Sequence, residues 1–194
     1  MFQSEKELTK HLKSLIEKSE IPKLKDIYTG EDINRKISRA LEKLEKYYNI
    51  KRLKFLAIPD LVLVFKDWGH RYMRGMKDEP FIIAIELKFL SDDKKLRQAY
   101  REFGQPLRYF IHGYDSTVLW HVFPSNFNDD EIRSYTKLMK ELVEDLFKDY
   151  WIISRMKIET RYFPIFYIST KIISNDKFVI YYPSYNPNIA KLTT

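Results

Sequence analysis

The sequence contains no cysteine in 194 residues. This absence excludes zinc–thiolate and iron–sulfur sites, and it is typical of a reducing, cytoplasmic compartment. No apolar run approaches the length of a membrane span, and the N-terminal residues are charged throughout, so we expect neither a signal peptide nor a membrane partner. We find no internal repeat and no low-complexity segment. The histidines show no metal-ligand spacing; they are His11, His70, His112 and His121.

The chain does have enough apolar residues for a folded domain, together with an excess of positive charge. Hydrophobic residues make up 44% and aromatic residues 15% of the sequence, which is enough to bury the core of one globular domain. The formal net charge is +7, and a basic balance favours a polyanionic partner such as nucleic acid. Many lysine-rich proteins bind no nucleic acid, so charge alone does not decide the partner.

The most informative stretch is a pair of apolar runs, 58–65 and 80–90, separated by a polar, basic loop. Their β-branched and aromatic residues predict two buried strands. An antiparallel hairpin centred near Met73 gives the two strands equal arms and places Asp60 opposite Glu86. The sequence therefore predicts that two carboxylates face each other across the hairpin.

The second run also carries a cation. Side chains two residues apart in a strand share a face, so Lys88 lies on the side of Glu86 and Leu87 points the other way. Such a cluster costs on the order of several kcal/mol to bury unless it is paired. One ammonium cannot neutralise two carboxylates, whereas a divalent cation can, and hard oxygen ligands suit Mg²⁺ or Mn²⁺. The alternative is a structural ion pair at the end of a strand.

Pro59-Asp60, followed by Glu86-Leu87-Lys88, resembles the P-D…(D/E)-x-K signature of the restriction-endonuclease-like nucleases, the PD-(D/E)XK superfamily. The second half of the pattern also occurs over residues 92–95, where the surroundings are typical of a solvated helix start. The match at Glu86 is more specific because it lies in an apolar strand that follows a Pro-Asp strand.

The resemblance implies a metal-dependent deoxyribonuclease that hydrolyses phosphodiester bonds, with DNA as its partner. Asp60, Glu86 and the Leu87 carbonyl would hold Mg²⁺ or Mn²⁺, and Lys88 would lie near the attacking water. The chain differs from those relatives that need an iron–sulfur cluster, because it has no cysteine. The alternative function is a catalytically silent protein that kept the fold and binds DNA.

Two helices are expected before the hairpin. Residues 4–19 carry an apolar stripe, with Ser4 as the cap and Glu7 three residues later. Glu5 falls near the middle of this stripe, and the resemblance makes it a candidate metal ligand from the first helix. The alternative for Glu5 is a first-turn carboxylate that favours the helix dipole.

The second expected helix spans residues 32–48, and a strand is expected over 51–57. Glu45 lies at the margin of the second apolar stripe and is the fallback for the helical acid. The residues expected to face inward are Ile33, Ile37, Leu41, Leu44 and Tyr48.

A further helix is expected from about residue 92, followed by Gln105-x-x-x-Tyr109. This pair resembles the Q-x-x-x-Y motif of RecB-like nucleases and type I restriction subunits, which implies a DNA contact near the metal site. The alternative is an aromatic core face with a polar glutamine, and Pro106 predicts a helix break at 104–106. The arginines expected to contact DNA are Arg71, Arg74, Arg101 and Arg108; the alternative for the hairpin loop that carries the first two is a solvated tip.

The predicted fold is α/β, with a restriction-endonuclease-like αβββαβ core, an inserted helix and a strand over 117–123, all within residues 1–125. Residues 126–194 are expected to pack a helix (129–150) and aromatic strands (156–182) on this core. These strands are typical of packing against the core or against a second subunit of a homodimer; the alternative is a stacking platform for nucleic acid. Holliday-junction resolvases and RecB-like enzymes both resemble the chain, and its Ile-, Lys- and Tyr-rich composition is similar to that of proteins from thermophilic archaea and their viruses.

Overall fold

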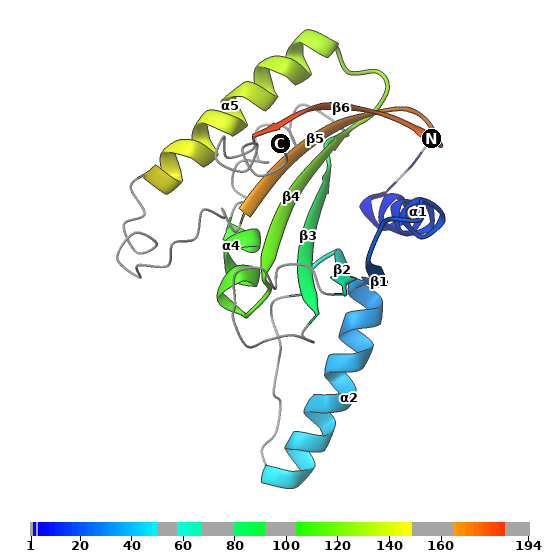
Figure 1. Ribbon diagram of the computed structural model, residues 1–194, viewed down its shortest axis with the longest axis vertical. Helices are drawn as coiled ribbons and strands as arrows, with labels where there is room; N and C mark the ends of the chain where they lie inside the picture. Colours follow the sequence, from blue (N-terminus) through cyan, green and yellow to red (C-terminus); the bar gives the residue numbers. More distant parts are fainter. Residues whose placement is uncertain are drawn as a thin grey trace.

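The computed structural model describes residues 2, 4–49, 58–66, 80–91, 104–148 and 165–184. These residues form an α/β fold with one six-stranded sheet and four helices (Figure 1). The helices are α1 (Glu5–Lys18), α2 (Gly30–Tyr48), α4 (Gly104–Ile111) and α5 (Asp129–Lys148). The strands are β1 (Leu24–Thr29), β2 (Leu61–Phe65), β3 (Phe81–Phe89), β4 (Ser116–Phe123), β5 (Ile165–Ser174) and β6 (Lys177–Ser184).

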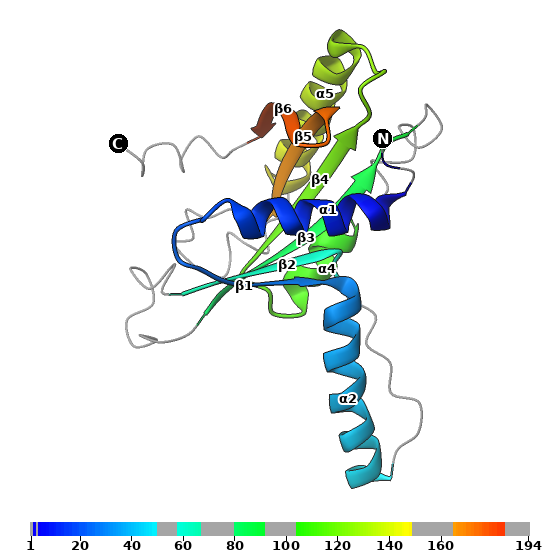
Figure 2. The same cartoon turned by 90° about the vertical axis from the view of Figure 1, so that its right-hand side faces the viewer.

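The strands lie side by side in the order of the sequence, and the sheet is mixed. β3, β4 and β5 are parallel, whereas β1–β2, β2–β3 and β5–β6 are antiparallel pairs. A helix bridges each parallel step, as parallel neighbours require: α4 lies between β3 and β4, and α5 lies between β4 and β5. α1 covers one face of the sheet, and α4 and α5 cover the other (Figure 2).

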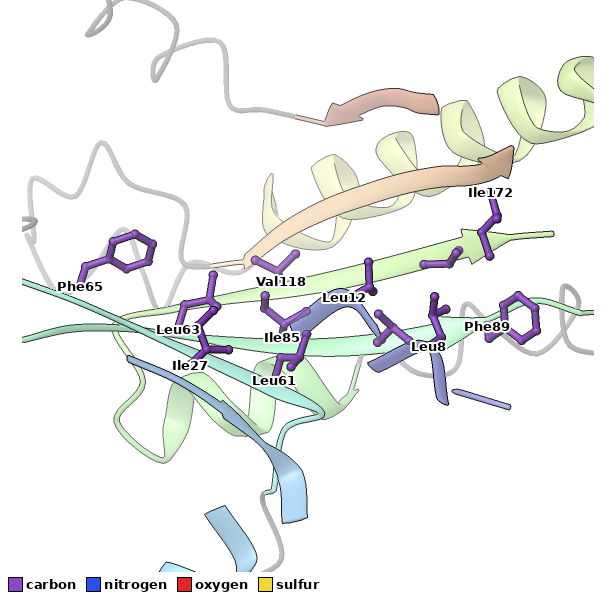
Figure 3. Close-up of a cluster of buried hydrophobic side chains, with 12 residues drawn as sticks. Leu8, Leu12, Ile27, Leu61, Leu63, Phe65, Ile85, Phe89, Val118 and Ile172 are labelled. Carbon is purple, nitrogen blue, oxygen red and sulfur yellow. The ribbon is translucent and has the colours of Figure 1, made fainter. Parts of the chain in front are cut away.

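The main core lies between α1 and the sheet (Figure 3). Leu8 and Leu12, one turn apart on α1, pack against alternate residues of the central strands, such as Ile85 and Leu87 of β3. Ser4 caps this helix by accepting the Glu7 N–H at 3.2 Å. The structure therefore confirms the helix predicted over 4–19. It is stabilised by the Ser4 cap and by burial of its apolar stripe.

The predicted hairpin is confirmed, including its register. Leu61 pairs with Ile85 and Phe65 pairs with Phe81, so the two strands are symmetric about residue 73. The predicted helix over 129–150 and the strand over 117–123 are also present, as α5 and β4.

Two expectations for the N-terminal third are wrong. The chain forms β1 between α1 and α2, where no strand was predicted, and the expected strand over 51–57 lies outside the described residues. The stripe of α2 does not face inward, since none of its residues is buried and the Leu44 side chain is 44% exposed. α2 instead projects away from the sheet (Figure 2).

The aromatic C-terminal strands pack into the sheet. Tyr167 is fully buried and Tyr181 is 8% exposed, so neither ring offers an open face for stacking on a base. This supports the core-packing alternative for these two residues, while residues 156–164 lie outside the described part of the chain. Within the described part, no helix is both long and apolar enough to cross a bilayer.

The contrast between α1 and α2 generates a testable prediction. Leu8→Ala should lower the free energy of unfolding by about 3 kcal/mol, because it opens a cavity in a closed core. Leu44→Ala, the same truncation on a helix, should cost less than about 0.5 kcal/mol, because Leu44 is already solvated. Urea unfolding followed by circular dichroism measures both values. A cost for Leu44→Ala as large as that for Leu8→Ala would show that the α2 face is covered.

Candidate functional site

The candidate site lies where β3 continues past the start of β2. The pairing between the two strands ends at Leu61 and Ile85, so residues 86–89 of β3 have no β2 residue beside them. Carboxylates take the place of the missing strand. The Leu87 N–H donates to Asp60 Oδ2 at 2.8 Å, and the Phe89 N–H donates to Glu5 Oε2 at 3.2 Å. The Asp60 carboxylate, just before β2, and the Glu5 carboxylate, on α1, thus both accept hydrogen bonds from the backbone of β3.

Glu86 and Lys88 form the buried centre of this site. The Glu86 side chain is 3% exposed, and its Oε1 lies 2.6 Å from Lys88 Nζ. The same ammonium lies 3.7 Å from Glu5 Oε1. The Tyr109 hydroxyl, on α4, donates to Glu86 Oε2, and its oxygen also lies 3.2 Å from the Ile58 carbonyl oxygen. Side chains from α1, β3 and α4 therefore meet here, beside the segment that leads into β2.

Two acids of the site, Asp60 and Glu86, are difficult to ionise. Burial and, after it, the nearby Glu86 carboxylate raise the pKa of Asp60 to about 7, although the Leu87 N–H acts against them. Burial also raises the pKa of Glu86, although Lys88 acts against this. For Lys88, burial acts to lower the pKa, but the carboxylates of Glu86, Glu5 and Asp60 together outweigh it, and the pKa rises to about 12. Lys88 is therefore a fixed cation at neutral pH, placed between acids that still repel one another.

Most of the residues predicted for the metal site lie together. Asp60, Leu87, Glu86, Lys88 and Glu5 form one connected cluster, which we call the β3-end cluster, and Tyr109 contacts it through Glu86.

Other predicted residues lie elsewhere. Glu45 is fifteen residues along α2 from Gly30, a distance of about 22 Å at 1.5 Å per residue, so it does not join the cluster. Gln105 lies one turn before Tyr109 on α4, and Arg108 is exposed there. The predicted DNA contacts Arg71, Arg74 and Arg101 lie outside the described residues.

The chemistry of the site suits a divalent cation, but few side chains are placed to bind one. Asp60 Oδ1 accepts no hydrogen bond from the described residues, and a cation beside it would stabilise the charged forms of two acids whose pKa values are raised mainly by burial. No group of three or more acidic or histidine side chains within the described ranges is arranged to hold a metal. A metal would therefore be held by Asp60 and Glu86, with main-chain or water oxygens completing its coordination.

One residue beside the site was missed by sequence reasoning. His121 of β4 is the strand partner of Lys88 and is completely buried. Its Nδ1 lies 3.0 Å from the Tyr167 hydroxyl and 3.2 Å from the Tyr135 hydroxyl, while Nε2 has no partner in the described part of the chain. Burial lowers the pKa of His121 to about 3, and the Lys88 ammonium adds to this. A histidine within the apolar run 117–123 was the available signal.

Comparison with known proteins adds no relative: no family model, curated protein or solved structure matches the chain. The case for a function therefore depends on the residues of the β3-end cluster and on their geometry.

The raised pKa of Asp60 predicts how stability depends on pH without metal. Between about pH 4 and pH 7 the folded protein retains a proton on Asp60 that the unfolded chain has lost, so the folded state loses stability as pH rises through this window. Asp60→Asn cannot titrate and can still accept the Leu87 N–H. We expect this variant to be about 2 kcal/mol more stable than the parent at pH 8, and nearly equal to it at pH 4.

Urea unfolding in EDTA at both pH values measures this difference. Glu42→Gln, which makes the same acid-to-amide change at an exposed position of α2, serves as the control and should leave the difference between the two pH values nearly unchanged. A parent more stable than Asp60→Asn at pH 8 would contradict the assignment of Asp60 as a strained, desolvated acid.

Proposed function

We propose that the protein is a metal-dependent deoxyribonuclease that hydrolyses phosphodiester bonds. The observation that carries this proposal is the convergence of Asp60, Glu86 and Lys88 at the end of β3. These are the three residues on which the resemblance to the PD-(D/E)XK superfamily depends. The order α1, β1, β2, β3, α4 and β4 also supports an αβββαβ core, with α2 inserted between the first two strands rather than before the first.

Each residue of the cluster has a definable task in this reaction. Asp60 and Glu86 would hold Mg²⁺ or Mn²⁺, which supplies charge neutralisation and lowers the pKa of a bound water. The Leu87 N–H fixes the Asp60 carboxylate, and Tyr109 fixes that of Glu86. Lys88 stays protonated, so it orients the attacking water or a non-bridging phosphate oxygen instead of removing a proton.

Glu5 gives the cluster a third acid. Its Oε2 accepts the Phe89 N–H and its Oε1 faces Lys88, so both oxygens are directed to the end of β3. We assign it the role of positioning Lys88. Without the Glu5 charge, Glu86 would be the one remaining acid in contact with the Lys88 ammonium. The ammonium would then shift toward Glu86 and be less well placed for a phosphate.

A catalytically silent DNA-binding protein is the second candidate, and one observation favours it. Both carboxylate oxygens of Glu86 already have partners, Lys88 on one side and Tyr109 on the other. A metal ligand that is fully engaged in this way must exchange the ammonium for the cation. If the ion pair does not open, the cluster stabilises the end of the hairpin and has no chemistry.

Cleavage assays separate the two candidates. The parent, with Mg²⁺ or Mn²⁺, should cut at least one of four substrates: supercoiled, linear, single-stranded or four-way-junction DNA. Glu86→Gln and Lys88→Met should each lower the rate at least about 10²-fold, because the first removes a metal ligand and the second removes the cation that orients the water or phosphate. Tyr109→Phe should have a smaller effect, because it removes only the support of Glu86.

Glu5→Gln and Glu45→Gln form a matched pair in the same assay. The first should slow cleavage, since Glu5 contacts Lys88, and the second should not, since Glu45 lies far along α2. DNA binding without cutting by the parent, with every metal and substrate, would favour the silent protein.

A further inference from the structure

A hollow with a volume of about 280 Å³ lies between α1, the edge strand β1 and the first half of α2. Its lining is strongly basic, with four cationic side chains and one carboxylate. The cations are Lys13, Arg35, Lys36 and Arg39, and the carboxylate is Asp32. The hollow is therefore suited to an anion, although it lies apart from the acidic β3-end cluster.

Asp32 holds part of this lining in place. It accepts the Thr29 N–H at 3.0 Å as the capping box of α2, and it also contacts Lys13 Nζ at 3.1 Å and Arg35 Nη2 at 2.6 Å. The Thr29 and Lys13 hydrogen bonds hold the pKa of Asp32 well below its usual range, so it is ionised. The Asp32 carboxylate thus fixes two of the four cations, Lys13 and Arg35, beside the N-terminus of α2.

The other two cations remain available to a ligand. Lys36 Nζ lies 3.7 Å from the centre of the Tyr28 ring, which places the ammonium and occupies one face of that ring. Arg39 makes no hydrogen bond or ion pair within the part of the chain that the structure describes. Because Lys36 covers one face of the Tyr28 ring, that face cannot stack on a base. The unpaired Arg39 guanidinium can bind a phosphate, so the hollow favours a phosphate over a stacked base.

The basic surface continues along α2. Lys36, Arg39, Lys43 and Lys46 fall within an arc of about 80° at 100° per residue, a surface that we call the basic face. It extends about 15 Å along the helix axis at 1.5 Å per residue. At 3.4 Å per phosphate of one DNA strand, this length matches about four phosphates.

The basic face begins close to the candidate site. The Gly30 N–H, at the start of α2, donates to the Asp60 carbonyl oxygen at 3.0 Å. Lys36 is six residues further on, about 9 Å along the axis, and Lys46 is about 24 Å along it. Because α2 projects from the sheet at this point (Figure 2), its cations follow a line that leads away from Asp60.

We propose that the hollow and the basic face of α2 bind the phosphate backbone of DNA on one side of the bond that is cut. The proposal rests on the proposed function, because it takes DNA as the substrate of the β3-end cluster. A lipid surface is the other polyanion to consider, since α2 also has an exposed apolar face. Only one margin of that apolar face is basic, while the opposite margin carries Asn34 and Glu45, so a membrane contact fits the helix less well.

Charge reversal on the basic face tests the proposal. Arg39→Glu/Lys43→Glu is compared with the parent and with Lys137→Glu/Lys140→Glu, which makes the same charge change on exposed positions of α5. Fluorescence anisotropy with a labelled 30-base-pair duplex, in EDTA and over a range of salt concentrations, gives the affinity and its salt dependence. Circular dichroism checks that each variant is folded, and Arg39→Gln/Lys43→Gln provides a milder second variant.

We expect the α2 reversal to weaken binding at least about tenfold. It should also reduce the slope of log K against log salt by about 2, because two cations no longer neutralise a phosphate. The α5 control should change the affinity no more than about twofold. Equal losses of affinity in the two variants would overturn the proposal. So would absence of duplex binding by the parent, or binding of the parent to phosphatidylserine vesicles instead of the duplex.

The proposal and the proposed function fail in different ways. If the parent binds the duplex through α2 but cuts no DNA with any metal, the nuclease function fails and the α2 interface stands. If the parent cuts DNA and the α2 reversal leaves affinity and salt slope unchanged, the nuclease function stands and the α2 interface is overturned.

Discussion

The repulsion between buried acids at the end of β3 is the constraint on which the rest of the site depends. Asp60 and Glu86 are brought together by the hairpin, and burial is the main cause that raises both pKa values. The Glu86 carboxylate adds to the rise for Asp60, and the Glu5 carboxylate adds to it for both acids. Lys88 offsets part of this cost, while the Leu87 N–H donates to the Asp60 carboxylate and the Tyr109 hydroxyl donates to that of Glu86. A fold that only needed stability could replace such a cluster by apolar residues. Its presence in an otherwise apolar strand is the physical argument for chemistry at this point.

The β3-end cluster and α2 are linked through the backbone. Thr29 caps α2 and also ends β1, and the next residue, Gly30, donates to the Asp60 carbonyl. A Cβ at Gly30 would lie 2.9 Å from the Pro59 carbonyl oxygen, so only glycine allows this close approach. The start of α2 is therefore fixed against the Pro-Asp segment. This arrangement gives the cations of α2 a defined direction relative to the acids.

The hairpin, its register and the first helix could be predicted from the sequence because each depends on local patterns. Two apolar runs that are symmetric about Met73 predict the pairing of β2 with β3, and Ser4 predicts the start of α1. β1 was missed because only Ile27 and Thr29 of this strand are buried, so its pairing with β2 defines it more than its own pattern does. The α2 stripe showed that one face is apolar, but not whether this chain covers it. The resemblance placed Tyr109 near the metal site, but it did not predict the hydrogen bond between Tyr109 and Glu86. The position of His121 beside Lys88 depends on a parallel crossover that no local pattern encodes.

The most direct test of the central claim is whether the β3-end cluster binds a divalent cation. Electron paramagnetic resonance measures free Mn²⁺ during titration of the parent and of Asp60→Asn, without DNA and without a requirement for cleavage. We expect one or two Mn²⁺ ions bound by the parent, an affinity at least about tenfold weaker in Asp60→Asn, and displacement by Mg²⁺. Equal Mn²⁺ affinity in the two proteins, or no binding by the parent, would contradict this claim and leave the cluster as a structural ion pair.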